Sequence, residues 1–214
     1  MERARYIVVE GPIGVGKSTL TRILAERFGA RTVFEIVEEN PFLPLFYKDQ
    51  EKYAFQTQLF FLLSRFKQQQ ELHQQELFAQ HTVSDYLFAK DRIFASLTLS
   101  DAELALYDRV FQLLQPRVVK PDLVIYLQAR LEVLLGRIKK RARDFEKNFD
   151  GDYLAGLCSA YNDYFFHYDD TPLLVINTSD INILENEDDL ENLLTMVRRH
   201  KKGVTHYIPK GSAS

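Results

Sequence analysis

Short runs of apolar, often β-branched residues alternate along the chain with longer stretches in which apolar positions recur every three or four residues. The short runs lie at 5–10, 31–35, 81–85, 122–127 and 172–177. Their nearly continuous apolar character is typical of strands that are covered on both faces. The longer stretches predict helices at 17–28, about 50–80, 86–95, 100–115, 129–142, 151–168 and 186–201. We therefore expect an α/β fold, with a five-stranded parallel sheet flanked by helices.

A glycine-rich loop, "GPIGVGKS" at residues 11–18, joins the first predicted strand to the first predicted helix. It satisfies the spacing G-x-x-x-x-G-K-[ST], in which glycines let backbone N–H groups approach phosphate oxygens. The lysine neutralises the β- and γ-phosphates, and the serine hydroxyl can bind Mg²⁺. We expect the loop to bind a nucleoside triphosphate through Gly11, Gly14, Gly16, Lys17, Ser18 and Thr19. The loop alone does not say what happens to the terminal phosphate.

Carboxylates stand at the ends of the first three predicted strands, as Glu10, Glu35 and Asp85. Ligands of parallel sheets bind at the carboxyl ends of the strands, so these residues are expected near the glycine-rich loop. A hydroxyl that accepts a phosphoryl group needs a base within hydrogen-bond reach, and a metal ion needs oxygen ligands. Glu35 and Asp85 can share these tasks, with Ser18 and Asp85 as metal ligands. The alternative is that both are solvated loop acids, as most Asp and Glu are.

A basic segment, "GRIKKRARDFEK" at 136–147, follows the fourth predicted strand by one helix. Arg137 and Arg141 share a face of that helix. Arginines can clamp a γ-phosphate and stabilise charge as it is transferred. We expect a lid at about 137–150, with Arg137 and Arg141 as catalytic residues and Arg141 and Arg143 as phosphate contacts. A solvated basic face is the alternative.

The overall composition sets limits on the function. With 214 residues and a net charge of −3, the chain is long enough for a proper core and lacks the basic excess of a nucleic-acid binder. A single cysteine, Cys158, excludes an intrachain disulfide and fits a reducing compartment. The N-terminal apolar run is broken by Glu10, so we expect no secretory signal, no membrane span and a cytoplasmic protein. Residues 204–214 are expected to form a loose C-terminal tail.

Several motifs occur in a fixed order: "GPIGVGKS", "FEIVEENPF", "FYKD", "FQTQLFFLLSR", "SDYLFAKD" and "RIKKRARDFE". Together they resemble the deoxynucleoside kinase family, especially its bacterial deoxyadenosine and deoxyguanosine kinases, over roughly residues 4–200. The resemblance implies a single P-loop kinase domain over residues 1–203. It also implies ATP and Mg²⁺ as cofactors, a homodimer, and phosphorylation of a deoxynucleoside 5′-hydroxyl in nucleotide salvage.

The resemblance implies roles for individual residues. Glu35 is then the general base that removes the proton from the 5′-hydroxyl, and Tyr47 and Glu146 bind the 3′-hydroxyl. The residues that contact the base are Gln58, Arg65 and Asp91. The lid arginines are Arg137, Arg141 and Arg143.

The chain departs from the family in one motif. Asp85 matches the first residue of an Asp/Glu-Arg-Ser motif, which places it in the substrate site, but Tyr86 and Leu87 replace the arginine and the serine. The missing positive charge is expected to come from Lys90 or Arg92, about one helical turn further on.

The identity of the base stays open. A glutamine amide offers one acceptor and two donors, which suits adenine or cytosine. Phe55, Phe88 and Phe94 can stack on a base or belong to the core. We favour deoxyadenosine and keep deoxyguanosine and deoxycytidine as alternatives.

Two other functions remain as rivals. A thymidylate-type nucleoside monophosphate kinase would share the loop, the sheet and the lid. It would need additional arginines for the phosphate of its acceptor, and Glu35 would repel that phosphate. A GTP-binding switch would read guanine through "NTSD" (177–180), which lacks the lysine of the usual Asn-Lys-x-Asp reader.

Overall fold

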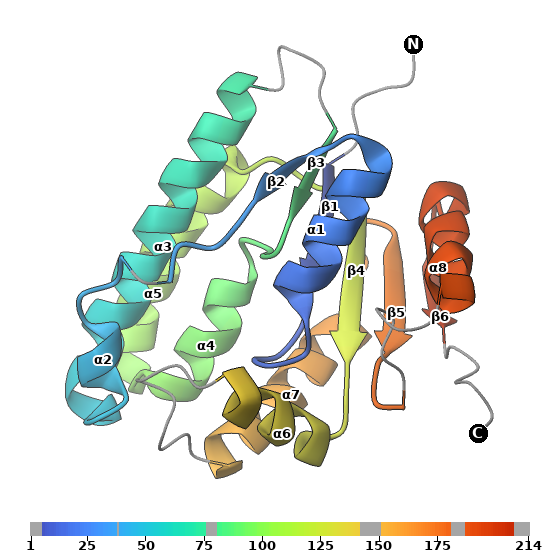
Figure 1. Cartoon of the computed structure of the whole chain (residues 1–214). Helices are drawn as coiled ribbons and strands as arrows, with labels where there is room; N and C mark the ends of the chain where they lie inside the picture. Colours follow the sequence, from blue (N-terminus) through green and yellow to red (C-terminus); the bar gives the residue numbers. More distant parts are fainter. Residues whose placement is uncertain (1–5, 38, 76–80, 142–150, 181–186, 208–214) are drawn as a thin grey trace.

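The computed structural model describes residues 6–37, 39–75, 81–141, 151–180 and 187–207. Within these residues six parallel strands form one sheet in the order β2-β3-β1-β4-β5-β6 (Figure 1). The strands are β1 (Tyr6–Glu10), β2 (Arg31–Val33), β3 (Thr82–Ser84), β4 (Leu123–Gln128), β5 (Leu173–Asn177) and β6 (Val204–Tyr207). All five expected strands are present, and the α/β fold with a parallel sheet is confirmed.

The expected number of strands is wrong, because β6 lies in the stretch that was expected to be a loose tail. β6 pairs in parallel with β5, from Leu173 opposite Val204 to Ile176 opposite Tyr207. Its residues alternate between exposed and half-buried positions, as an edge strand allows. The continuous apolar run of a strand covered on both faces is therefore missing from this segment.

Helices connect the strands and cover both faces of the sheet (Figure 1). They are α1 (Lys17–Phe28), α2 (Leu43–Phe46), α3 (Gln50–Gln75), α4 (Lys90–Thr98), α5 (Asp101–Leu114), α6 (Leu131–Arg141), α7 (Gly151–Phe166) and α8 (Glu187–Arg199), with the short 3-10 helix η2 (Gln115–Arg117) after α5. The sequence pattern did not predict α2. No helix in the described ranges combines the length and the apolar character that crossing a membrane requires.

Helix α4 begins at Lys90, four residues later than expected. The backbone N–H of Leu87 donates a hydrogen bond of 2.8 Å to the buried carboxylate of Glu10. This bond holds the segment between β3 and α4 in a non-helical turn. An apolar pattern alone does not reveal such a long-range contact.

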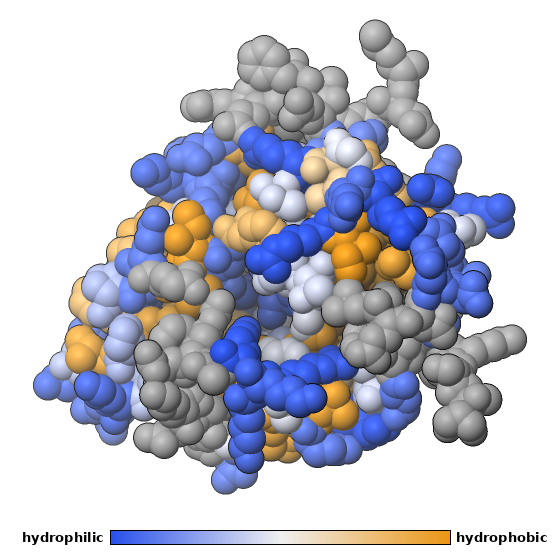
Figure 2. All heavy atoms as spheres, viewed as in Figure 1, coloured by the Kyte–Doolittle hydropathy of each residue, from blue (hydrophilic) through white to orange (hydrophobic). Residues whose placement is uncertain are grey.

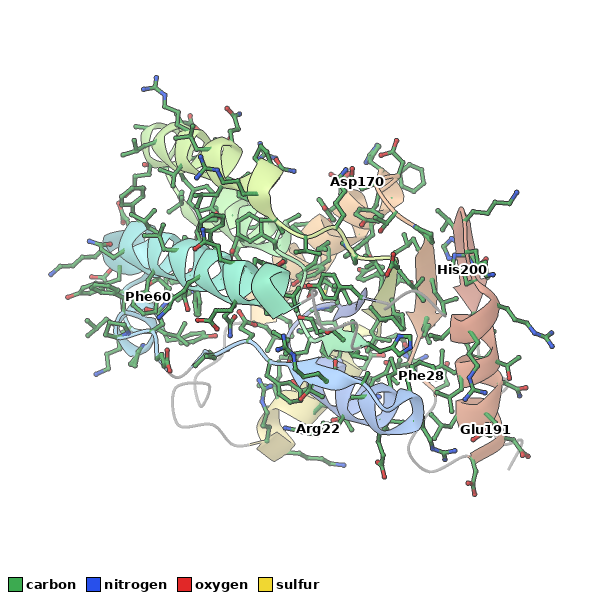
Figure 3. All side chains as sticks on the ribbon, turned by 90° about the horizontal axis from the view of Figure 1, so that it is seen from above. Arg22, Phe28, Phe60, Asp170, Glu191 and His200 are labelled. Carbon is green, nitrogen blue, oxygen red and sulfur yellow. The ribbon has the colours of Figure 1, made fainter. Side chains whose placement is uncertain are left out.

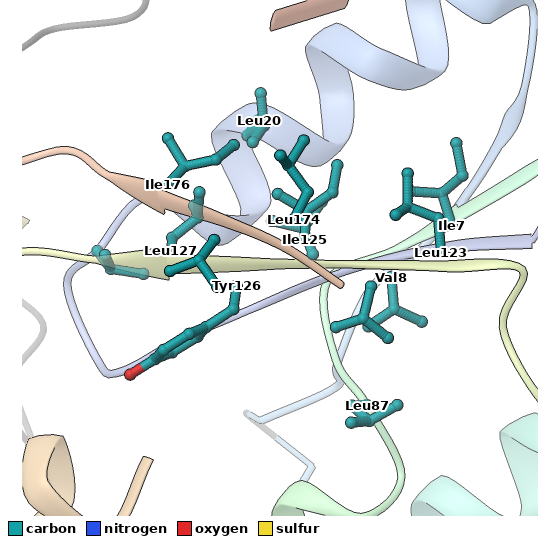
Figure 4. Packing of buried hydrophobic residues seen from close by; sticks show 14 of the residues in the cluster. Ile7, Val8, Leu20, Leu87, Leu123, Ile125, Tyr126, Leu127, Leu174 and Ile176 are labelled. Atoms are coloured by element: carbon teal, nitrogen blue, oxygen red, sulfur yellow. The ribbon is translucent and has the colours of Figure 1, made fainter. Parts of the chain in front are cut away.

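The apolar side chains of the strands alternate between the two faces of the sheet. On one face Ile125 and Leu174 point toward Leu20 of α1 (Figure 4). On the other face Tyr126 stacks against α7, with its ring centroid 4.1 Å from that of Phe165. Helices α1 and α7 therefore cover opposite faces of the central strands.

Helix α8 lies beside α1 on the same face. Figure 3 shows Phe28 of α1 directed toward α8, and the guanidinium of Arg198 lies 5.4 Å from the centre of the Phe28 ring. Arg27 also pairs with Glu191 at 2.6 Å. These contacts fix the outer helix to the one that follows the glycine-rich loop.

The ends of three strands bring the chemical segments together. The glycine-rich loop follows β1, Glu35 lies two residues after β2, and Asp85 follows β3 directly. Strand β3 is hydrogen-bonded to both β1 and β2. Because all three strands are parallel, these segments meet at the same edge of the sheet.

Gly14 of the glycine-rich loop packs closely against α6, and a substitution at this position measures how tight the packing is. Its φ is +83°, and a Cβ there would lie 2.8 Å from Ile138 Cγ1 and 3.0 Å from the Leu134 carbonyl oxygen. We expect Gly14→Ala to lower the free energy of unfolding by about 2 kcal/mol, from backbone strain and overpacking together. Denaturant titration measures this change.

The matched control is Gly136→Ala in α6, where no atom lies within 4 Å of the added Cβ. Alanine is favoured over glycine inside a helix by about 1 kcal/mol, so this variant should be more stable than the wild type. Equal stability of the two variants would contradict the packing described for Gly14.

Candidate active site

A cavity of about 900 Å³ opens at the carboxyl ends of β1, β2 and β3. The glycine-rich loop and α1 line one side, and residues of α2, α3 and α4 line the other. Figure 2 shows hydrophilic side chains around a hollow near the middle of the face seen in Figure 1. One cavity can thus hold two ligands, one at the loop and one against the helices.

The loop has the geometry of an anion-binding site. Gly11, Gly14 and Gly16 adopt φ values of +150°, +83° and +106°, and Gly16 is the N-cap of α1. The N–H groups and the positive end of the helix dipole therefore face the cavity. Gly11 does not line the cavity; its carbonyl oxygen instead accepts a hydrogen bond of 2.7 Å from Lys17 Nζ.

Lys17 lies folded over its own loop. Its ammonium donates to the carbonyl oxygens of Gly11 and Pro12, at 2.7 and 3.2 Å. Burial, with a smaller contribution from nearby Lys90, lowers the pKa of Lys17 to about 8. A phosphate group would favour the charged form, so anion binding is coupled to protonation of this lysine.

Asp85 joins the loop to the second strand. One carboxylate oxygen accepts a hydrogen bond of 2.6 Å from the Ser18 hydroxyl. The other accepts one of 2.7 Å from the backbone N–H of Glu35. The alternative of a solvated loop acid is therefore wrong for Asp85, which is only 5% exposed.

Glu35 is held by two buried cations. Arg65 of α3 pairs with one carboxylate oxygen, and Lys90 of α4 donates to the other at 2.6 Å. Arg65 also pairs with the buried Asp91. Burial lowers the pKa of Lys90 to about 8 and that of Arg65 to about 10. Glu35 is thus a fixed group in the lining of the cavity and not a solvated acid.

Of the two cations that were expected to replace the missing arginine, the structure places one in the cavity. Lys90 lines the cavity. Arg92 points away from it, and its exposed guanidinium pairs with Asp108 at 2.9 Å. Tyr86 is fully buried.

Of the other residues expected to bind the deoxynucleoside, some line the cavity and one lies in the core. Tyr47, Gln58 and Arg65 line the cavity, whereas Asp91 does not and lies fully buried behind Arg65. The Gln58 side-chain amide donates to the Thr98 hydroxyl at 3.3 Å, which leaves its oxygen available to a ligand.

The three candidate stacking residues also divide. Phe94 lines the cavity, but Phe55 and Phe88 pack in a separate apolar cluster between α3, α4 and α5. Phe61 and Tyr153 line the cavity instead. Both lie in apolar helical patterns that resemble core positions, so the sequence carried no signal for them.

Arg137 contacts the loop and the segment after β5. It donates to the carbonyl oxygens of Val15 and Thr178, at 3.2 and 2.9 Å. Arg141 also lines the cavity. Arg143 and Glu146 lie outside the described residues, so their expected contacts remain predictions.

The loop after β5, considered from the sequence as a guanine reader, lines part of the cavity. Thr178, Ser179 and Asp180 line the cavity beside Arg137. Asn177 does not line it; its side-chain oxygen accepts a hydrogen bond of 2.9 Å from the backbone N–H of Ser179.

A Mg²⁺ ion fits the donor set at Ser18 and Asp85. Their hydroxyl and carboxylate oxygens lie 2.6 Å apart beside the loop. Mg²⁺ prefers oxygen ligands and takes few from the protein when phosphates and water supply the rest. Among the described residues no group of three or more His, Cys, Asp or Glu side chains could hold a metal ion.

Comparison with known proteins points to one family. Residues 7–202 match the model of the deoxynucleoside kinase family. A deoxyguanosine kinase of Bacillus subtilis (strain 168) is 42% identical over 162 residues, which are 75% of this chain and 78% of the relative. A deoxyadenosine/deoxycytidine kinase of the same organism is 33% identical, with coverage of 89% and 90%. The structure of deoxyadenosine kinase from M. mycoides with bound dATP is similar at a TM-score of 0.78 and 25% identity, over 89% of this chain and 99% of that one.

The Asp85 bridge predicts a specific order of stabilities. Asp85→Ala leaves the Glu35 N–H and the Ser18 hydroxyl without their partner, and should lower the free energy of unfolding by about 1–3 kcal/mol. Asp85→Asn should cost less, because its amide oxygen can accept from Glu35 N–H while its amino group donates to Ser18. Denaturant titration of both variants gives the comparison.

Asp108→Ala is the control, since it removes a solvated ion pair with Arg92 and should cost at most about 1 kcal/mol. If Asp85→Ala were no more destabilising than Asp108→Ala, Asp85 would not hold the loop to the second strand.

Proposed function

The chain belongs to the deoxynucleoside kinase family, and we propose that it transfers the γ-phosphoryl group of ATP to the 5′-hydroxyl of a deoxynucleoside. The observation that carries the proposal is the position of Glu35 in the same cavity as the glycine-rich loop. A base for a hydroxyl and a cradle for a triphosphate together favour transfer to an alcohol. The cellular role would be nucleotide salvage in the cytoplasm.

The donor half comprises the loop, α1 and α6. In the proposal the loop N–H groups and Lys17 hold the β- and γ-phosphates, and Arg141, which lines the same cavity and acts electrostatically on Lys17, neutralises charge. Arg137, fixed by Val15 and Thr178, lines the donor end near Asp180. Ser18 and Asp85 would hold Mg²⁺, which would supply positive charge against the phosphates.

The acceptor half comprises Glu35 and the wall formed by α2, α3 and α7. In the proposal Glu35 accepts the proton of the 5′-hydroxyl while the oxygen attacks the γ-phosphorus. Tyr47 lines the cavity where the 3′-hydroxyl of the sugar would lie. Tyr153 lies near it, as their joint contacts with the Phe46 ring indicate. The two tyrosines would narrow the sugar end of the cavity.

A nucleoside is favoured over a nucleotide as acceptor. The group around Glu35 contains two cations, Arg65 and Lys90, and two carboxylates, Glu35 and Asp91, all paired with one another. Two positive and two negative charges leave no net charge for the phosphate of a nucleoside monophosphate. This balance argues against the thymidylate-type kinase.

The GTP-binding switch is disfavoured by Asn177. A guanine reader needs its asparagine to face the base, and Asn177 instead caps its own loop through Ser179. Family membership argues in the same direction.

For the base we propose deoxyadenosine, with deoxyguanosine and deoxycytidine as alternatives. Gln58 offers its amide oxygen as an acceptor, because its amide nitrogen already donates to Thr98. Arg65, held by its ion pair with Asp91, offers N–H donors. Adenine offers an amino donor and ring-nitrogen acceptors to such a set. The relatives named above include kinases named for each of these bases.

We also propose a homodimer through α3 and α5. Both helices carry large exposed apolar side chains, including Leu63, Leu106 and Leu113 at 49%, 51% and 73% exposure. Such side chains on neighbouring helices are typical of a surface that is covered in an assembly.

Glu35→Gln tests the general base. The variant keeps the shape of the side chain but accepts a proton poorly, so kcat should fall about 10²–10⁴-fold. ATP affinity should change little, because the loop is intact. Steady-state kinetics and ATP titration measure the two effects, with the exposed Glu51→Gln in α3 as control. Turnover near the wild-type rate in Glu35→Gln would remove Glu35 from this role.

The base preference is tested by competition among the four deoxynucleosides at equal concentration. We expect dAMP to form about tenfold faster than the other three monophosphates, because one additional hydrogen bond to the base contributes about 1.4 kcal/mol, which corresponds to a factor of ten. Gln58→Leu should reduce kcat/KM for deoxyadenosine, and the exposed Gln56→Leu should not. Faster formation of dGMP would contradict the assignment of the base and leave the kinase activity standing.

A further inference from the structure

Lys90 occupies a position that local structure disfavours. It is the first residue of α4, where the positive end of the helix dipole repels a cation. Its side chain is only 4% exposed, and burying an ammonium costs several kcal/mol unless it is paired. A lysine at a buried helix N-terminus therefore calls for a reason beyond the stability of the helix.

The surroundings of Lys90 supply that reason. Its ammonium donates to Glu35 at 2.6 Å and lies 5.7 Å from the centre of the Phe94 ring. The charges of Glu10 and Asp85 act on Lys90 as well, and the charge of Lys90 acts on Lys17. Lys90 therefore contacts the carboxylate that the proposed function makes the base, and it is close enough to Lys17 for the two charges to interact.

Arg65 does not duplicate this role. Its guanidinium is shared between Glu35 and Asp91 and lies 4.7 Å from the centre of the Phe61 ring. It is thereby fixed at the wall of the cavity. Lys90 makes its one described ion pair with Glu35 and has a flexible stem that can follow a moving charge.

We propose that Lys90 positions the Glu35 carboxylate before transfer and then neutralises the transferred phosphoryl group, an inference that rests on the proposed function. As the hydroxyl oxygen bonds to the γ-phosphorus, its proton passes to Glu35 and the bond from phosphorus to the departing ADP oxygen breaks. Neutral Glu35 no longer balances the ammonium of Lys90. Lys90 stays protonated, and its ammonium then interacts with the oxygens of the phosphoryl group as that group moves from the donor to the acceptor.

The test compares Lys90→Met with Arg92→Met, a change two residues further along the same helix at an exposed pair. Lys90→Met should lower kcat about 10²-fold, with KM for deoxynucleoside changed less than about threefold, because the acceptor pocket is intact. Arg92→Met should keep the wild-type kcat. Lys90→Arg, which restores the charge, should recover at least about tenfold over Lys90→Met.

A double-mutant cycle separates this role from a merely structural one. In the Glu35→Gln background Lys90→Met should cost about tenfold in kcat instead of about 10²-fold, because the carboxylate that Lys90 positions is already neutral while its charge near the phosphoryl group is still lost. A wild-type kcat in Lys90→Met, or a full additional loss in the Glu35→Gln background, would overturn the inference. Those outcomes leave the wild-type kinase activity in place, whereas an inactive wild type would instead contradict the proposed function.

Discussion

The cavity depends on one carboxylate that holds two segments, which lie 67 and 50 residues before it in the sequence. Asp85 accepts the Ser18 hydroxyl with one oxygen and the Glu35 backbone N–H with the other. Strand order makes this possible, because β3 lies between β1 and β2. The glycine-rich loop and the proposed base are therefore held at a fixed separation, which a transfer between two bound ligands requires.

Burial of charge is the second constraint. Lys17, Lys90 and Arg65 all have lowered pKa values because the cavity desolvates them. Such buried cations reduce the stability of the empty protein and increase its attraction for phosphate. Glu35 and Asp91 balance two of them, whereas Lys17 contacts only carbonyl oxygens in the described hydrogen bonds. The end of the cavity at the glycine-rich loop, where Lys17 lies, is thus the end better suited to bind an anion.

Much of this arrangement could be predicted from the sequence, because strand periodicity and the glycine-rich spacing are local signals. They place the loop after β1, Glu35 after β2 and Asp85 after β3. The remainder depends on contacts between distant segments. The hydrogen bond from Leu87 to Glu10 makes α4 begin later in the sequence than its apolar pattern predicts. Pairing with β5 makes β6 an edge strand although its sequence is polar. Tyr153 has the sequence pattern of a core residue, and only the packing of α7 places it at the cavity. Likewise, only the fold shows that Lys90 lines the cavity and that Arg92 pairs with Asp108 instead.

In the proposed reaction, the triphosphate held by the loop is used to phosphorylate a nucleoside hydroxyl. This is tested by following the label from ATP labelled in its γ-phosphate, in parallel reactions with the four deoxynucleosides and with the four deoxynucleoside 5′-monophosphates. We expect the label to appear as deoxynucleoside 5′-monophosphate in the reactions with deoxynucleosides. Label found only in inorganic phosphate, or transferred to deoxynucleoside monophosphates but not to deoxynucleosides, would contradict the proposed reaction.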